Sequence, residues 1–367
     1  MLKFLLLLLI CNQSFGQHIA QQLDSIMLKN FPKNQPGAAL LISKNGKVLY
    51  ANGFGLANTT IDKEDKITIA TNFRMASVSK QFTAMCIMLL EQQHQLSYED
   101  NLLNFFPHWN KKVGERIKIK HLLTHSSGIW DYETLIPINQ HDQMMDADVV
   151  DFLLNKDTVY FEAGTAFQYS NSGFCVLEQI IEKVSGLSYV QFIEQNIFKP
   201  LGMKNSRIFV SGKAIPNRAM GFTRNKENEI MESDQSITSA TKGDGCVYTS
   251  INDYQKWVDA LINNKLINIS SELKQINRKI EGTKNAYYGM GWFNAINTKK
   301  VLELYHTGST CGFSNAVKII PKNKFIIVYF SNIADNLNSF FEVEEILLRN
   351  NIDESEIDFK KLYNLTR

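Results

Sequence analysis

The sequence predicts an α+β fold in which both ends of the chain supply strands to one antiparallel sheet. Near the N-terminus, strand-like runs at 38–43 and 47–53 flank Asn45-Gly46, a dipeptide typical of a two-residue hairpin turn. Helical periodicity dominates the middle of the chain, and strand-like runs return from Ala286 onward. We therefore expect a sheet assembled from the two termini and flanked by helices, with a large, mainly helical insertion between its halves.

The individual elements follow from periodicity and from stop signals such as Gly186, which ends one helix. Helices are expected at 18–31, 77–95, 117–125, 146–155, 172–185, 188–198, 253–263 and 336–349. The C-terminal strands are expected at 287–293, 301–306, 313–320 and 325–331. This pattern divides the chain into a signal peptide (1–16), a discontinuous sheet domain (17–75 and 285–350), a mainly helical domain (76–284) and a polar tail (351–367).

The first residues have the pattern of a secretory signal, because Lys3 precedes an apolar run at 4–10 and an acceptable cleavage site ends at Gly16. Cys11 suggests lipid attachment as an alternative, against which the bulky Ile10 argues. No later apolar run is long enough to cross a membrane. We expect an exported protein, periplasmic or secreted, with no membrane span after signal removal.

The composition is that of an ordinary folded protein, with 44% hydrophobic and 21% charged residues in a chain of 367. The formal net charge of +2 gives no reason to expect binding to nucleic acid or to an acidic membrane surface. A small molecule or a short polymer is the expected partner. Four cysteines remain after cleavage, and their wide spacing favours buried free thiols over disulfides: Cys86, Cys175, Cys246 and Cys311.

Several familiar active-site motifs are absent from the sequence. It contains no G-x-S-x-G elbow and no glycine-rich nucleotide loop. His121 and His125 have the i, i+4 spacing of two zinc ligands on an expected helix, but they lack the adjacent glutamate of H-E-x-x-H. A packing role is therefore favoured for both, and no metal or cofactor is expected.

The motif Ser-x-x-Lys occurs three times, at Ser77/Lys80, Ser239/Lys242 and Ser271/Lys274. Only the first opens a helix whose following residues, 84–90, are all apolar, so this helix is expected to be buried. Its hydroxyl and amine, three residues apart, share a face near the positive helix end, which is one way to activate a serine nucleophile. The alternative is a helix-capping serine followed by a solvated lysine.

Two further short motifs follow in the chain. Tyr169-x-Asn171 lies in a turn before a helix, and His306-Thr307-Gly308 is expected to end a strand. Taken singly, the first is explained by a capping turn and the second by a bend at the strand end. Together with the serine and lysine, and in this order, they favour a catalytic site.

In this order the three elements resemble the serine β-lactamase and penicillin-binding protein superfamily, on the branch of class C β-lactamases, D,D-carboxypeptidases and related esterases. Class A enzymes carry Ser-Asp-Asn as the second element, whereas this chain has a tyrosine there. The resemblance covers roughly residues 30–345 and includes H-L-L-T-H-S-S-G at 121–128, N-I-F-K-P-L-G-M at 196–203 and G-D-G-C-V-Y-T-S at 243–250. It implies a β-lactamase/transpeptidase-like fold.

The resemblance also implies a role for each motif residue. Ser77 would form an acyl-enzyme, Lys80 would assist in a neutral or proton-sharing form, and Tyr169 would relay protons and later activate water. Asn171 would orient Lys80 and contact a substrate amide. The remaining element, His306, Thr307, Gly308 and Ser309, would bind substrate, and the backbone N–H groups of Ser77 and Ser309 would form an oxyanion hole.

Two positions depart from the pattern of the family. Many β-lactamases and D,D-peptidases carry lysine where this chain has His306, and histidine is mostly neutral at pH 7 unless an acidic neighbour raises its pKa. Asp244 stands where a small neutral residue is expected, and it could raise the pKa of His306 or repel anionic substrates. Strong β-lactamase activity is therefore in doubt, whereas acyl transfer is still expected.

The sequence thus predicts an exported serine hydrolase that cleaves an ester or amide through Ser77. D-amino-acid peptides, β-lactams and cell-wall fragments are candidate substrates, and the choice among esterase, D,D-peptidase and β-lactamase stays open. The alternative is a sensor that is acylated by a β-lactam or cell-wall peptide without turnover. Both hypotheses require the same three motifs.

Overall fold

The computed structural model describes residues 17–59 and 65–366. The predicted signal peptide, with Cys11, lies outside the described residues. Within them, no helix combines the length and apolarity that a bilayer span needs. The four cysteines of the described chain are free thiols, of which Cys86, Cys175 and Cys246 are buried as expected, whereas Cys311 is partly exposed.

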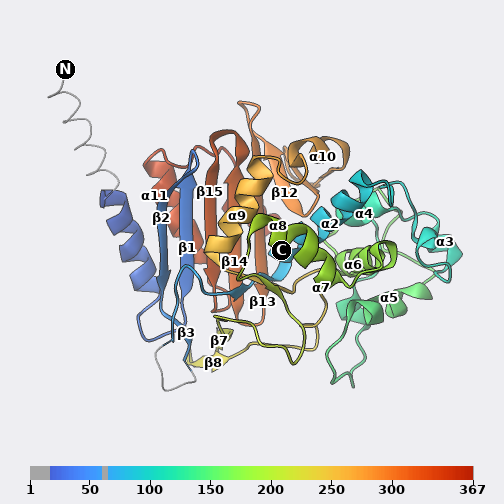
Figure 1. Ribbon diagram of the computed structural model, residues 1–367, viewed down its shortest axis with the longest axis horizontal. Helices are drawn as coiled ribbons and strands as arrows, with labels where there is room; N and C mark the ends of the chain where they lie inside the picture. Colours follow the sequence, from blue (N-terminus) through green and yellow to red (C-terminus); the bar gives the residue numbers. More distant parts are fainter. Residues whose placement is uncertain (1–16, 60–64, 367) are drawn as a thin grey trace.

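An eight-stranded antiparallel sheet forms the centre of the molecule, in the order β10-β11-β12-β13-β14-β15-β1-β2. Its strands are β1 (Ala38–Lys44), β2 (Lys47–Phe54), β10 (Arg278–Lys279), β11 (Ala286–Gly289), β12 (Trp292–Ile296), β13 (Leu302–Thr310), β14 (Phe313–Ile320) and β15 (Phe325–Ser331). The pairing of β1 with β15 joins the two ends of the chain, and Figure 1 shows the blue β1 beside the red C-terminal strands. The predicted sheet built from both termini is confirmed.

The predicted hairpin is present between β1 and β2. Asn45 and Gly46 both have positive φ, 54° and 74°, as a two-residue turn of this kind requires. The strand expected to end at His306 instead continues to Thr310. Its pairing with β12 stops at Tyr305, so beyond that residue this edge of β13 has no strand partner among the described residues.

Helices cover both faces of the sheet. On one face, Tyr329 packs against Phe31, which follows the helix at 17–30, and against Phe340 of α11 (Leu337–Arg349). The next residue, Phe330, points the other way and packs against Tyr254 of α9 (Ile251–Ile262). Figure 1 shows the teal and green helices of the middle of the chain grouped beside the sheet.

The remaining elements are mostly short. The helices are α2 (Lys80–Gln92), α3 (Lys111–Gly114), α4 (Ile119–Leu123), α5 (Asp146–Leu154), α6 (Asn171–Ser185), α7 (Tyr189–Ile193), α8 (Lys199–Leu201), α10 (Ile269–Gln275) and α12 (Phe359–Thr366). The 3-10 or π-helical turns are η1 (Ala76–Ser79), η2 (Leu102–Asn104), η3 (Tyr132–Leu135), η4 (Glu194–Phe198) and η5 (Pro321–Asn323). Short strands outside the main sheet are β3 (Leu56–Asn58), β4 (Asp65–Lys66), β5 (Phe73–Arg74), β6 (Arg207–Ile208), β7 (Phe222–Arg224), β8 (Ile230–Glu232) and β9 (Val247–Thr249).

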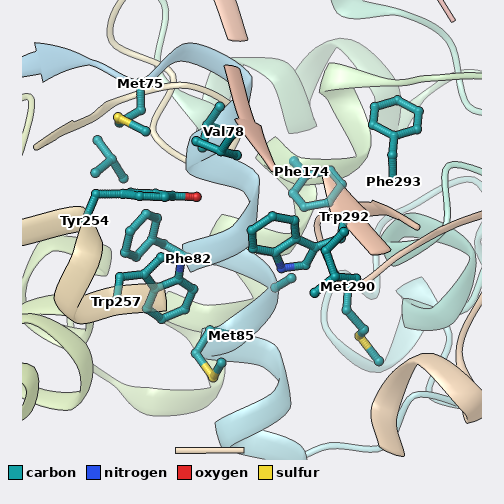
Figure 2. Packing of buried hydrophobic residues seen from close by; sticks show 14 of the residues in the cluster. Met75, Val78, Phe82, Met85, Phe174, Tyr254, Trp257, Met290, Trp292 and Phe293 are labelled. Atoms are coloured by element: carbon teal, nitrogen blue, oxygen red, sulfur yellow. The ribbon is translucent and has the colours of Figure 1, made fainter. Parts of the chain in front are cut away.

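Helix α2 is the buried helix that the sequence predicts. Its residues 80–90 are all buried. Figure 2 shows large side chains on both sides of it, and Phe82 stacks on Trp257 with ring centroids 4.4 Å apart. A helix packed on all sides is rigid, so it fixes the position of the η1 turn that precedes it.

Candidate active site

Ser77 lies in η1, directly before α2. The residue before it, Ala76, has a φ of +49°, a conformation that side-chain-bearing residues seldom adopt outside constrained sites. Gly308 of β13 lies against this turn, and a Cβ atom there would come 2.2 Å from the Met75 carbonyl oxygen and 3.2 Å from the Ser77 nitrogen. The strand can therefore approach Ser77 closely because residue 308 is glycine.

The amine of Lys80 connects Ser77 to two other elements. Lys80 has no exposed surface, and its Nζ donates to Ser77 Oγ at 3.1 Å, to Asn171 Oδ1 at 2.8 Å and to the Asp244 carbonyl oxygen at 2.9 Å. Three acceptors match the three donors of an ammonium group; a neutral amine keeps two of these donors, and its lone pair can then face the Ser77 hydroxyl. The Nζ also lies 5.1 Å from the ring centroid of Tyr169. The amine is thus fixed beside the serine, and the Lys80 side chain itself is shielded from solvent.

Tyr169 precedes α6 and presents its hydroxyl to the same site. That hydroxyl is buried and has no hydrogen-bond partner among the described residues. Its ring packs against His125, with centroids 4.1 Å apart, and is stacked on Phe293 at 6.2 Å. Because a buried polar atom normally has a partner, the Tyr169 hydroxyl is available to a bound substrate or water.

Asn171 begins α6, where the side chain of Ser170 caps the helix by accepting from the Gly173 N–H. The Asn171 Oδ1 accepts from Lys80, and the Asn171 Nδ2 donates to Glu133 Oε1 at 3.2 Å. Burial raises the pKa of Glu133. Sequence reasoning missed Glu133, because the loop at 129–145 has no periodic pattern that marks it.

His306 faces the site from β13 as an uncharged side chain. Its Nδ1 lies 2.6 Å from the Thr307 carbonyl oxygen and its Nε2 lies 3.1 Å from the Tyr288 hydroxyl. The pKa of His306 is lowered to about 3, mainly because the ring is buried. The hydrogen bond to the Thr307 carbonyl raises this pKa, and the nearby Lys80 lowers it further. A neutral ring that donates from Nδ1 and accepts at Nε2 satisfies both contacts.

Asp244 therefore does not raise the pKa of His306, which is one of the two effects considered for it from the sequence. The Asp244 side chain is buried and does not line the cavity at Ser77. Its Oδ2 accepts from the Tyr132 hydroxyl at 3.4 Å. Burial raises the pKa of Asp244 itself. What Asp244 supplies to the site is its backbone carbonyl, which accepts from Lys80.

The pKa of His306 leads to a prediction about pH. In the unfolded chain a histidine titrates near 6.5, whereas in the folded protein the pKa of His306 is about 3. The unfolded state therefore binds this proton first, so the stability gained from a neutral His306 is complete above pH 6.5 and is lost as pH falls toward 3. We expect the urea midpoint of the wild type to fall more steeply between pH 6.5 and 4 than that of the His306→Gln variant. Equal slopes would contradict this assignment.

His121 and His125 do not lie on one helix, although their spacing is that of two ligands on a helix face. Helix α4 ends at Leu123, so His125 lies beyond the helix, with a φ of +51°. Its Nδ1 accepts from the Ser170 N–H at 3.1 Å, and burial lowers its pKa well below the usual range. No group of three or more metal-binding side chains occurs within 17–59 and 65–366. His125 thus supports the turn that carries Tyr169.

A cavity of about 170 Å³ opens beside the nucleophile. Its lining residues are Ser77, Tyr169, Phe293, His306, Thr307, Ser309 and Tyr363. The structure therefore brings all three predicted motifs to one place. Sequence reasoning missed Phe293 and Tyr363, because neither lies in a motif and each reaches the cavity through the tertiary fold.

Comparison with known proteins agrees with this geometry. A family model described as Beta-lactamase matches residues 18–348. The chain belongs to the β-lactamase family. The predicted relation to the serine β-lactamases and penicillin-binding proteins is confirmed, and membership places the chain among β-lactamase-related serine hydrolases.

Among curated proteins, the chain is 30% identical over 334 residues to penicillin-binding protein 4* of Bacillus subtilis (strain 168), a match that covers 86% of this chain and 72% of the relative. It is 29% identical over 322 residues to protein flp of Staphylococcus aureus (strain MW2), covering 85% of this chain and 63% of that protein.

Solved structures show the same fold. The octameric penicillin-binding protein homologue from Pyrococcus abyssi superposes with a TM-score of 0.79 at 25% identity, over 94% of this chain and 80% of its own. A D-amino acid amidase from Ochrobactrum anthropi SV3 superposes with a TM-score of 0.75 at 20% identity, over 91% and 99%. The predicted β-lactamase/transpeptidase-like fold is confirmed.

Proposed function

We propose that the protein is an exported hydrolase that cleaves an ester or amide through an acyl-enzyme on Ser77. The observation that carries this proposal is the set of hydrogen bonds made by Lys80 Nζ, which tie the amine to the Ser77 hydroxyl and to Asn171 in a buried site. Export rests on the signal-like segment at 1–16, which lies outside the described residues.

In the acylation step, Ser77 Oγ bonds to the substrate carbonyl carbon, and the bond from that carbon to the leaving group breaks. Lys80, in its neutral form, accepts the serine proton, and the Tyr169 hydroxyl delivers a proton to the leaving group. Backbone N–H groups of Ser77 and Ser309 are the proposed donors to the carbonyl oxygen as it gains negative charge.

In the second step a water molecule bonds to the acyl carbon and the bond to Ser77 Oγ breaks. Tyr169, deprotonated in the first step, takes one proton from that water, and Lys80 returns to Oγ the proton that it accepted. Tyr169 suits both steps, because its hydroxyl is unpartnered among the described residues and because Tyr169 and Ser77 line the same cavity.

The names of relatives indicate the class of substrate. They include a penicillin-binding protein, a D-amino acid amidase and a D-stereospecific amidohydrolase. We propose a small amide, ester or short peptide, with cell-wall fragments as one source. A neutral His306 cannot attract a substrate carboxylate by charge, so carboxylate recognition, where it occurs, relies on hydrogen bonds alone.

Replacing Ser77 with alanine is expected to abolish both ester hydrolysis and labelling by a fluorophosphonate probe, because the nucleophile is lost. The matched control is Ser271→Ala, since Ser271 heads another Ser-x-x-Lys motif but lies exposed on α10. Labelling of the Ser77→Ala variant at wild-type rate would overturn the proposal. A time course on the wild type separates the alternatives, because an enzyme turns over steadily and a sensor stops after one equivalent.

A further inference from the structure

The chain after α11 is fastened across one face of the sheet. The buried Lys318 of β14 donates from Nζ to Glu344 Oε1 at 2.6 Å, Asp353 Oδ2 at 2.7 Å and Ser355 Oγ at 2.7 Å. Two of these acceptors lie in the segment at 350–358 that leads to α12. The tail is therefore tied to the sheet by a buried ion cluster rather than by surface contacts alone.

A second set of contacts brings the tail to the strands beside the active site. The backbone N–H of Glu356 donates to Glu303 Oε1 at 3.1 Å, and its Oε2 accepts from the N–H of Thr298 at 2.7 Å. Phe359, at the start of α12, is buried and packs edge-on against Tyr305 of β13 with ring centroids 4.9 Å apart. Helix α12 is thus fixed next to the residue that precedes His306.

Tyr363 follows Phe359 by four residues, so the two side chains share a face of α12. It lines the cavity that contains Ser77 and Tyr169, beside the edge of β13 that β12 leaves unpaired after Tyr305. The cavity measures about 170 Å³, which is small beside the roughly 300–1,000 Å³ of typical ligand pockets. Tyr363, whose ring packs against Phe341 with centroids 6.0 Å apart, therefore forms part of the boundary that keeps the cavity small.

We propose that Tyr363 is a specificity-determining residue that restricts the substrate to small leaving groups. The proposal rests on the proposed function of Ser77. In that mechanism the Tyr169 hydroxyl protonates the leaving group attached to the carbon that Ser77 attacks, so we place the leaving group in the cavity that Ser77 and Tyr169 line. The favoured substrates are then simple amides, small-alcohol esters and peptides that lose one terminal residue, rather than internal bonds of long chains.

The test compares two esters with the same acyl group, phenyl acetate and biphenyl-4-yl acetate. Their two phenols have nearly equal acidity, so the ratio of their kcat/KM values reports the size of the leaving group. We expect the wild type to favour phenyl acetate, and Tyr363→Ala to raise the biphenylyl-to-phenyl ratio at least about tenfold, since pocket fit is commonly worth that factor.

Two control variants make the result specific. Tyr363→Phe retains the ring and is expected to retain the wild-type ratio. Lys360→Ala removes a side chain from the same helix that does not line the cavity, and it too should leave the ratio unchanged. All three substitutions are compatible with a helix, so α12 is kept in each.

Each outcome decides between the hypotheses. An unchanged ratio in Tyr363→Ala, with hydrolysis still dependent on Ser77, would overturn the role of Tyr363 and leave the serine mechanism standing. A shift in Tyr363→Phe as large as that in Tyr363→Ala would also overturn it, because a hydroxyl contact and not the ring would then set the preference. Hydrolysis that persists in Ser77→Ala would overturn both proposals.

Discussion

Replacing Lys80 with methionine is expected to lower kcat/KM for an activated ester by about 10²–10⁴, the usual contribution of a positioned proton-transfer group. Methionine fills similar space without an amine, so Ser77 loses the partner that lies 3.1 Å from its Oγ. The measurement is the initial rate of phenyl acetate hydrolysis, with the urea midpoint recorded to show that the variant is folded.

The control for this prediction is Lys274→Met, the matching change in the exposed Ser-x-x-Lys motif on α10. It should leave kcat/KM within about twofold of the wild type, because Lys274 lies outside the cavity. A folded Lys80→Met variant with wild-type kcat/KM would contradict the proton-transfer role. Slow phosphonate labelling of Ser77 in the variant is compatible with it, since the nucleophile itself is retained.

The three Ser-x-x-Lys motifs differ in their surroundings, and this difference explains why the apolar run after Lys80, and not the motif itself, identified the proposed catalytic serine. In the second motif, Ser239 Oγ accepts from the Ser236 N–H at 2.8 Å and the Lys242 Nζ bonds to Glu178 at 3.3 Å. Ser239 thus stabilises the loop that precedes Asp244, and Lys242 pairs with a buried carboxylate, so neither group is available to the other. Only the apolar run after Lys80 indicated a buried helix, and burial is what leaves the amine with Ser77 as one of its few acceptors.

The fold was predictable where local pattern and tertiary structure agree. Asn45-Gly46 determines its own turn, and the apolar run at 84–90 can be accommodated only inside the molecule. The segment at 351–367 shows the opposite case, because its many charged residues indicated only a polar tail. There Phe359 and Leu362 are buried against the rest of the protein. The carboxylate of Asp353 binds Lys318, and that of Glu356 accepts a hydrogen bond from the Thr298 N–H.

The site was predictable in its motif residues and not in their surroundings. Nothing near His306 in sequence indicates that Tyr288 will lie at its Nε2, or that burial will hold its pKa at about 3. Glu133 and Tyr363 reach the site from segments without a catalytic pattern. Such residues are found from distances in three dimensions, because their sequence separation from Ser77 carries no periodic signal.

Replacing Lys318 with methionine is expected to lower the free energy of unfolding by about 3–5 kcal/mol, the typical result of removing one partner from a buried ion cluster. Burial alone would lower the pKa of Lys318, but the carboxylates of Glu344 and Asp353 outweigh it and raise that pKa, so the amine is charged at neutral pH. Without the amine, two carboxylates remain buried and uncompensated. Urea unfolding at pH 7 measures the loss, and an unchanged midpoint would contradict it.

The neutral triple variant Lys318→Met, Glu344→Gln, Asp353→Asn provides the control, because it removes the whole cluster of charges instead of one member. It should recover most of the lost stability, since replacing a complete buried ion cluster is commonly neutral. The single variant also connects stability to specificity. Lys318 holds the segment that positions α12, so below its urea transition Lys318→Met should raise the biphenylyl-to-phenyl ratio in the same direction as Tyr363→Ala. A destabilised variant that keeps the wild-type ratio would show that Phe359 alone suffices to hold Tyr363 beside the nucleophile.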